Sequence, residues 1–92
     1  MDEKPAIIVV DDESDALAAI RDALTRRFGE DYRILPHPSA RPALEAVCEI
    51  KEKGEEIALV IADQRMPEMR GRDFLGRVRS IMPMAKQTLM VD

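Results

Sequence analysis

The sequence feature that most constrains the fold is a continuous apolar run, residues 57–62, that ends abruptly in the carboxylate of Asp63. A run of branched apolar residues is typical of a parallel strand that is buried on both faces. A short polar loop with Pro67 and Gly71 follows at once. Because open α/β sheets place their chemistry beyond the carboxyl ends of their strands, Asp63 is the first candidate for a reactive group.

Short apolar runs alternate with amphipathic stretches along the whole chain. Strands are predicted at residues 6–10, 32–35, 57–62 and 88–91. Helices are predicted from a cap at Ser14 or Asp15 up to Gly29, from residue 40 to about residue 53, and from Gly71 or Arg72 up to Pro83. Strands that alternate with helices imply right-handed crossovers and a parallel sheet with helices on both faces. The predicted fold class is therefore α/β, with a flavodoxin-like parallel sheet of strand order 2-1-3-4.

Local signals predict the boundaries and buried faces of these elements. Ser14 or Asp15 is expected to cap the first helix, and Ser39 the second. The segment 32–35 is short and flanked by charge, which favours an edge position, and His37, between two prolines, is expected in a loop. The second helix is expected to bury a face made of Ala43, Leu44, Val47, Cys48 and Ile50.

Composition restricts the classes of function. The 92 residues, 46% apolar and 35% charged, predict one soluble globular domain over residues 1–92. A net charge of −4 is unlike a nucleic-acid-binding surface, and neither a membrane-spanning stretch nor a signal peptide is expected. Because the single Cys48 cannot form an internal disulfide, a cytoplasmic location is expected.

The acidic residues are predicted to meet at one edge of the sheet. Asp11 and Asp12 follow the first strand as Asp63 follows the third, and these two strands are neighbours in the predicted order. Two carboxylates about 5 Å apart repel by roughly 3 kcal/mol at an effective dielectric near 20. Such a cluster raises some of its pKa values or binds a cation, and all-oxygen ligands favour Mg²⁺. A carboxylate beside Mg²⁺ can attack phosphorus to give an aspartyl phosphate.

The chain contains Val9-Val10-Asp11-Asp12-Glu13 after the first strand, and Asp63-Gln64-Arg65-Met66-Pro67 with Gly71 after the third. Together these motifs resemble the receiver domain of bacterial two-component response regulators, whose fold is CheY-like. It implies that Asp63 is the phosphoacceptor, that Asp12 binds Mg²⁺ directly and that Asp11 binds it largely through water. The backbone carbonyl of Arg65 would complete the metal ligands. The implied donor is a phosphohistidine on a histidine kinase or a phosphotransfer protein, and the domain itself is not expected to be an enzyme.

The chain also departs from the family pattern. It lacks the usual last helices and fifth strand, so it is interpreted as a receiver truncated after the fourth strand. Val91 stands where the family has Thr or Ser, and the family's lysine has no counterpart, because Lys86 precedes the fourth strand. The alternative is therefore a phosphorylation-impaired pseudo-receiver that serves as a dimerisation or protein-interaction module. An apolar edge at residues 88–91 favours a homodimer, through the fourth strand or the third helix.

Two kinds of enzyme with a comparable acidic strand end match the sequence less well. Haloacid-dehalogenase-type phosphatases need Asp-x-Asp after the first strand, which Asp11-Asp12-Glu13 does not provide. No Gly-x-x-x-x-Gly-Lys loop is present to hold a nucleotide, so an enzyme is the minor alternative. A basic cluster around the third helix is interpreted as a solvated face or a partner surface; it comprises Arg65, Arg70, Arg72, Arg77 and Arg79.

Overall fold

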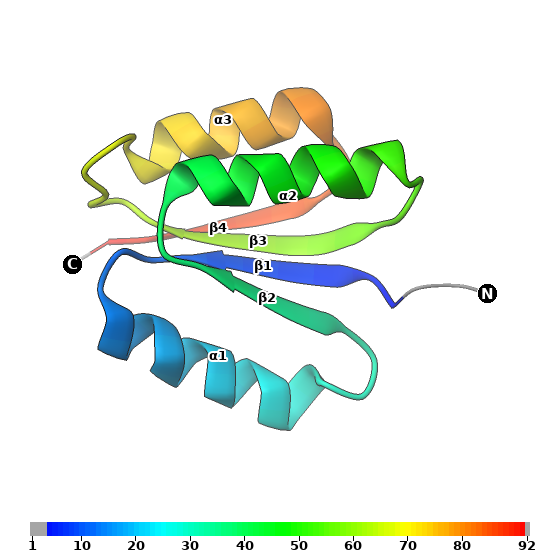
Figure 1. Cartoon of the computed structure of the whole chain (residues 1–92), viewed down its shortest axis with the longest axis horizontal. Helices are drawn as coiled ribbons and strands as arrows, with labels where there is room; N and C mark the ends of the chain where they lie inside the picture. The colour runs from blue at the N-terminus through cyan, green and yellow to red at the C-terminus, as the bar shows by residue number, and fades with distance from the viewer. Residues whose placement is uncertain (1–3, 92) are drawn as a thin grey trace.

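Four parallel strands and three helices alternate along the chain in the computed structural model, which describes residues 4–91 (Figure 1). The elements are β1 (Ala6–Val10), α1 (Ser14–Phe28), β2 (Arg33–His37), α2 (Ala40–Glu52), β3 (Ile57–Asp63), α3 (Gly71–Ile81) and β4 (Lys86–Met90). The strands form a single sheet in the order β2-β1-β3-β4. The predicted α/β class and the strand order 2-1-3-4 are confirmed.

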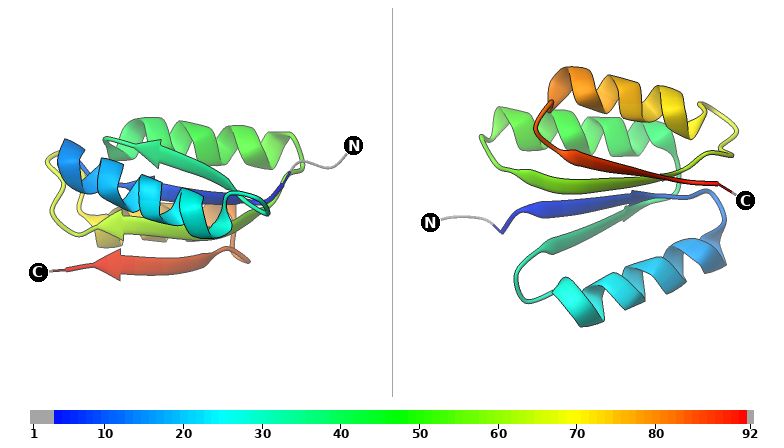
Figure 2. Two further views of the ribbon diagram at one scale, coloured as in Figure 1. Left: turned by 90° about the horizontal axis from the view of Figure 1, so that it is seen from below. Right: turned by 180° about the vertical axis from the view of Figure 1, so that it is seen from behind.

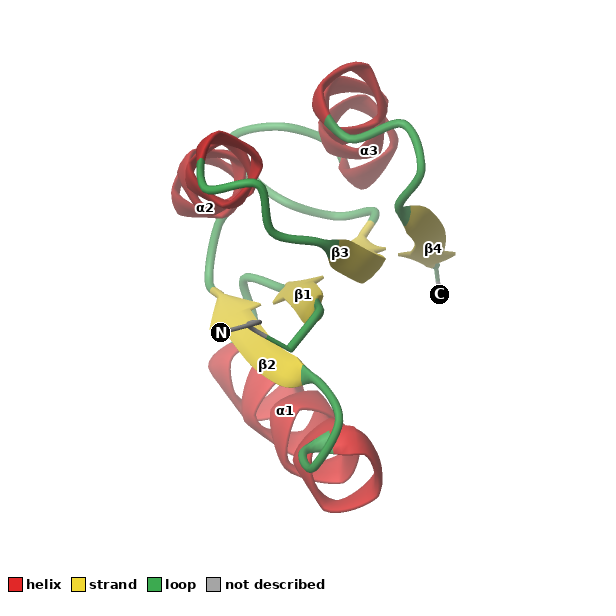
Figure 3. Ribbon diagram, turned by 90° about the vertical axis from the view of Figure 1, so that its right-hand side faces the viewer, coloured by secondary structure: helices red, strands yellow, loops and turns green. Residues whose placement is uncertain are grey.

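The helices cover the two faces of the sheet unequally. α1 lies on one face, below β1 and β2, whereas α2 and α3 lie side by side on the other (Figures 2 and 3). The main core fills the space under α2 and α3, where Phe74, Val47 and Val60 are fully buried. α1 has no buried residue. No helix within residues 4–91 is long and apolar enough to cross a membrane.

The side chains of β3 and β4 alternate between the two faces, as the pleat of a strand requires. Val60 belongs to the core under α2 and α3, and in β4 Leu89 packs against the same core. Lys86 and Thr88 therefore point to the opposite face, where Thr88 pairs with Ile61 of β3. Thr88 is exposed and Ile61 is half-buried, so this part of the opposite face is open.

The two outer strands differ from their predicted bounds. β2 runs from Arg33 through His37 and not over residues 32–35, and the loop prediction for His37 is wrong. The predicted edge position of β2 is confirmed, and it explains why Pro36 is tolerated there. β4 begins at Lys86, which pairs with Leu59, and ends at Met90, so the predicted span 88–91 is also wrong. Val91 follows β4, and 67% of its surface is exposed. Strand ends are set here by pairing with a neighbour rather than by local apolar pattern.

Two predictions about the helices are wrong as well. Glu13, and not Ser14 or Asp15, caps α1, because its carboxylate accepts the backbone N–H of Ala16 at 2.6 Å. Cys48 is exposed, although it was expected in the core. Successive helical residues differ by about 100° in direction, so with Val47 facing the sheet its neighbour points away. Ser39 precedes α2 as its N-cap residue, as predicted, although its side chain makes no capping bond.

Candidate functional site

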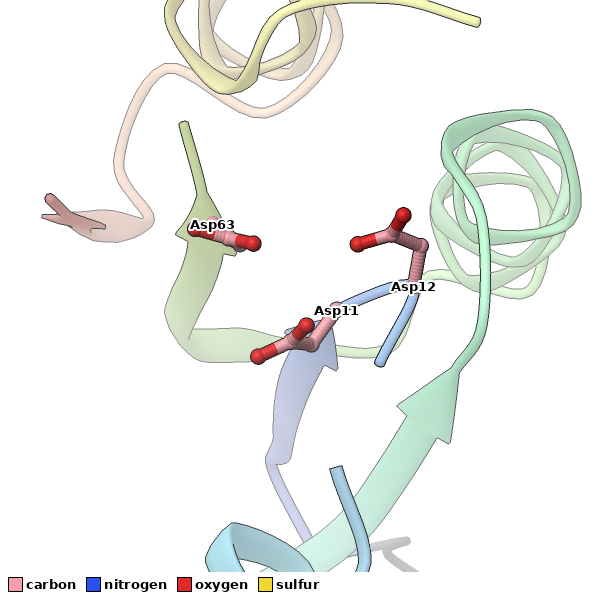
Figure 4. A group of neighbouring side chains, drawn as sticks. All are labelled: Asp11, Asp12 and Asp63. Atoms are coloured by element: carbon pink, nitrogen blue, oxygen red, sulfur yellow. The ribbon is translucent and has the colours of Figure 1, made fainter. Parts of the chain in front are cut away.

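Three carboxylates converge at the carboxyl edge of the two central strands. β1 and β3 are hydrogen-bonded neighbours, and Val10 pairs with Ala62. Asp11 and Asp12 therefore leave β1 at the level where Asp63 ends β3 (Figure 4). One carboxylate oxygen from each residue lies within 4.8 Å of the other two. The prediction that these acids meet is confirmed.

The three carboxylates differ in exposure and in their hydrogen bonds. Asp11 is only 5% exposed, whereas Asp63 is half-buried and Asp12 is exposed. Asp11 is held in place on both sides: its Oδ1 accepts the backbone N–H of Glu13 at 3.0 Å, and its own N–H donates to the carbonyl of His37 at 3.2 Å. Asp11 thus lies in a fixed position on the buried side of the site, while Asp12 and Asp63 remain accessible to solvent.

The surroundings of Asp11 oppose its ionisation. Burial raises the pKa of Asp11 above its ordinary value of 3.8, the hydrogen bond from Glu13 partly opposes this, and the negative charges of Asp63, Asp12 and Glu13 raise the pKa further. A carboxylate whose charged form is disfavoured by burial and by neighbouring charge is stabilised when a cation binds beside it.

Replacing Asp11 with Asn is expected to increase the free energy of unfolding at neutral pH in the absence of metal. The amide retains an oxygen that can accept the Glu13 N–H but carries no charge to desolvate or repel. Because the folded-state pKa is raised, the ionised form costs stability at all pH values above that pKa. This cost disappears as the pH falls through the folded pKa towards 3.8.

Urea unfolding of both proteins with a chelator present measures this effect. The advantage of Asp11→Asn over the native chain should be largest near neutral pH and should shrink in acid. A less stable variant at neutral pH would contradict the prediction, since it would mean that the carboxylate makes a net stabilising interaction in the fold.

The donor set fits a hard divalent cation. All three groups are carboxylates, and one oxygen from each lies within 4.8 Å of the other two. Within residues 4–91, the side chain of the buried Asp11 accepts the Glu13 N–H and forms no ion pair. Oxygen ligands of this kind suit Mg²⁺ better than zinc or copper, which favour nitrogen and sulfur. The residues present are therefore those that could hold Mg²⁺.

Gln64, the residue after Asp63, organises the loop beyond the acids. Its N–H donates to the carbonyl of Met90 at 2.9 Å, which ties the end of β3 to β4. Its carbonyl accepts the N–H of Gly71 at 3.2 Å, and its side-chain Oε1 accepts the N–H of Arg72 at 3.1 Å. Gln64 thus caps α3, a role that sequence reasoning missed because the cap comes from eight residues upstream.

The loop between Gln64 and Gly71 borders a hollow beside the carboxylates. This hollow has a volume of about 550 Å³ and is lined by Asp12, Gln64, Arg65, Met66, Pro67 and Arg70. Met66 is buried and anchors the loop, whereas Arg65 and Arg70 are exposed. The other arginines of the predicted basic cluster, Arg72, Arg77 and Arg79, are exposed on α3. The acidic site is therefore flanked by positive charge.

Comparison with known sequences supports a single family. The family model described as response regulator receiver domain matches residues 7–91. The hydrogenase transcriptional regulatory protein HoxA of Cupriavidus necator is 33% identical over 82 residues, which cover 89% of this chain and 15% of HoxA. The chain thus spans only a small part of the length of this curated relative.

Comparison with solved structures gives the same fold. A response regulator receiver domain protein from Clostridium thermocellum superimposes with a TM-score of 0.77 at 28% identity, covering 95% of this chain and 64% of that one. The response regulator TrrA of Thermotoga maritima gives a TM-score of 0.73 at 29% identity, covering 95% of this chain and 69% of TrrA. TrrA has been crystallised in complex with Mg²⁺ and BeF, and also with the histidine kinase ThkA.

Proposed function

The chain belongs to the response regulator receiver domain family, and from this premise we propose that it is a signalling domain that accepts a phosphoryl group on Asp63. The observation that carries the proposal is the cluster of Asp11, Asp12 and Asp63, whose oxygens lie within 4.8 Å of one another at the carboxyl edge of β1 and β3. The domain would act as a phosphoacceptor in a relay and not as an enzyme with its own substrate.

Asp63 is placed to act as the nucleophile. It ends β3, its carboxylate is half-buried, and the Gln64 hydrogen bonds fix the backbone that follows it. An Asp63 oxygen would form a bond to phosphorus as the bond from phosphorus to the donor breaks. The developing negative charge must be balanced in this acidic site, since Asp11 and Asp12 both face the same space.

Asp11, Asp12 and Asp63, with the backbone carbonyl of Arg65, would hold Mg²⁺ in this site. A bound Mg²⁺ supplies positive charge that neutralises the phosphoryl oxygens and the attacking carboxylate. Asp11 is held by the Glu13 N–H and the His37 carbonyl, so it would orient the metal ligands from the buried side. The exposed Asp12 would contribute from the solvent side.

The donor would be a phosphohistidine on a histidine kinase or a phosphotransfer protein. The structure of TrrA in complex with the kinase ThkA supports this choice, because TrrA has the same fold at 29% identity. Exchange between a kinase and this chain would place the domain in the cytoplasm.

Incubation of the chain with Mg²⁺ and acetyl phosphate, followed by intact-mass measurement, tests the proposal. We expect one phosphoryl adduct on the native chain and none on Asp63→Asn. Asp31→Asn is the matched control, since Asp31 is an exposed turn residue between α1 and β2, at the opposite edge of the sheet. Chelation of the metal should prevent adduct formation on both the native chain and the control.

The outcomes separate two functions. An adduct that persists in Asp63→Asn would overturn the assignment of Asp63. No adduct on the native chain, with Mg²⁺ binding retained, would favour the second candidate, a pseudo-receiver that acts as a dimerisation or interaction module. The open face beside β4, with exposed Thr88 and Val91, is the observation that favours this candidate. A homodimer, through β4 or through α3, is proposed in either case.

A further inference from the structure

The layer formed by α2 and α3 carries a groove that the phosphoacceptor site does not use. The groove has a volume of about 550 Å³ and lies between the two helices. Leu44, Cys48 and Met69 supply apolar lining, and the charged lining comprises Arg41, Arg77, Glu45, Glu49, Glu52 and Glu68. Leu44 and Met69 are half-buried and Cys48 is exposed, so part of this apolar lining faces solvent. The groove and the outer sides of its two helices are called the α2–α3 face below.

Four charged side chains of this face have no partner among residues 4–91, whereas Glu49, which also lines the groove, pairs with Lys53 at 3.7 Å. Among residues 4–91, no ion pair or side-chain hydrogen bond involves Arg41, Glu45, Asp73 or Arg77, all of which are exposed. Elsewhere the chain does form such pairs, as between Arg33 and Glu55 at 3.0 Å. Charges that remain unpaired around an apolar groove are available to a partner.

The order of these charges is self-complementary. α2 carries Arg41 and then Glu45 four residues later, and α3 carries Asp73 and then Arg77 four residues later. Each pair is one helical turn apart, so both members lie on the same side of their helix. Both helices begin at the same edge of the sheet and run in the same direction (Figure 1). Along this shared direction, α2 carries a positive and then a negative side chain, whereas α3 carries a negative and then a positive one. The two helices are therefore complementary in charge.

We propose that the α2–α3 face is a homodimer interface whose two-fold axis runs along the groove, parallel to both helices. With this axis, α2 of one protomer packs against α3 of its partner, and α3 of the first protomer packs against α2 of its partner. The same surface is thus used twice, as an isologous interface requires. Arg41 then meets Asp73 of the other protomer, and Glu45 meets Arg77, so that four ion pairs surround the apolar lining. The inference rests on the homodimer proposed above and names its surface.

Gly76 gives independent support for a close partner. It lies within α3 and is exposed, and a Cβ added there would meet no atom within 4 Å. Neither packing nor a positive φ accounts for a glycine here, although glycine weakens a helix interior. Gly76 lines a hollow on α3 together with Asp73 and Arg77, so the missing side chain lowers the helix surface beside these two charges and lets a second helix approach.

Charge exchange in the whole chain tests the proposal by sedimentation over a range of protein concentrations. The native chain should dimerise, and Arg77→Glu or Glu45→Arg alone should weaken the dimer by about tenfold or more. An equimolar mixture of the two variants should restore dimers, because each mixed dimer regains both opposite-charge pairs. Neither variant should change the unfolding midpoint of dilute protein, since both side chains are exposed and unpaired.

Two further variants identify the surface. Gly76→Ala should strengthen α3 and yet weaken the dimer, whereas Thr88→Lys, on the opposite face of the sheet, should leave the dimer intact. A dimer that survives the charge reversals but is lost in Thr88→Lys would overturn this surface while retaining the homodimer. A native chain that stays monomeric at every concentration would overturn both, and neither outcome bears on phosphorylation of Asp63.

Discussion

Truncation of Phe74 to alanine is expected to lower the free energy of unfolding by about 3–5 kcal/mol. Phe74 is the largest fully buried side chain, and it projects from α3 into the core under α2 and α3. Its removal would lose the transfer free energy of the ring and leave a cavity that close-packed neighbours fill only partly. Because a domain of this size has a total stability of about 5–14 kcal/mol, the variant should be near the limit of folding.

Urea unfolding followed by circular dichroism measures the loss, with Phe28→Ala as the control. Phe28 is 37% exposed on α1 and contacts the ring of Tyr32 edge-on, with 6.1 Å between centroids. Its truncation should cost about 1 kcal/mol, the scale of one aromatic pair. A larger loss for Phe28→Ala than for Phe74→Ala would mean that the main core lies on the α1 side of the sheet.

Replacing Gly71 with alanine is expected to disturb both stability and the phosphoacceptor site. An added Cβ would overlap the backbone carbonyl oxygen of Asp63 and lie 2.7 Å from Cδ1 of Leu89. The Leu89 side chain can move, but the carbonyl belongs to the end of β3, so either α3 or Asp63 must shift. Overpacking of this kind typically costs about 1–3 kcal/mol. We also expect slower phosphoryl acceptance, because Asp63, the proposed nucleophile, is displaced.

Gly76→Ala is the matched control for this prediction, since it makes the same chemical change in the same helix. No atom lies within 4 Å of the added Cβ at Gly76. In dilute protein the control should raise stability by up to about 1 kcal/mol and leave phosphoryl acceptance unchanged. Equal behaviour of the two variants in unfolding and in the acetyl phosphate assay would contradict the steric explanation for Gly71.

The sequence was sufficient to predict the central half of the molecule and the acidic site. β1 and β3 are continuous apolar runs, and each is followed or ended by aspartate, so once the strands are parallel neighbours the acids must meet. α3 begins at Gly71, one of the two residues predicted to open it. Strong local patterns and the resemblance to the receiver family pointed to the same fold.

The errors lie where tertiary contacts decide. β2 extends over Pro36 and His37 because β1 offers partners up to Val10, which no local pattern reveals. Cys48 is adjacent to the buried Val47 but faces solvent, since its direction depends on how α2 is rotated over the sheet. The capping of α3 by Gln64 is a contact across a loop, and capping rules describe residues adjacent to the helix.

The hydrogen bonds of Gln64 also affect how this domain could diversify. The loop 65–70 begins after Gln64, at the end of β3, and ends at Gly71, the first residue of α3. A hydrogen bond from the Gly71 N–H to the Gln64 carbonyl closes the loop. Substitutions in the exposed part of the loop, at Arg65 or Arg70, can therefore change the surface that meets a donor while the strand end carrying Asp63 stays in place. Under the proposed function, donor recognition and phosphoryl acceptance would occupy adjacent residues and could evolve separately.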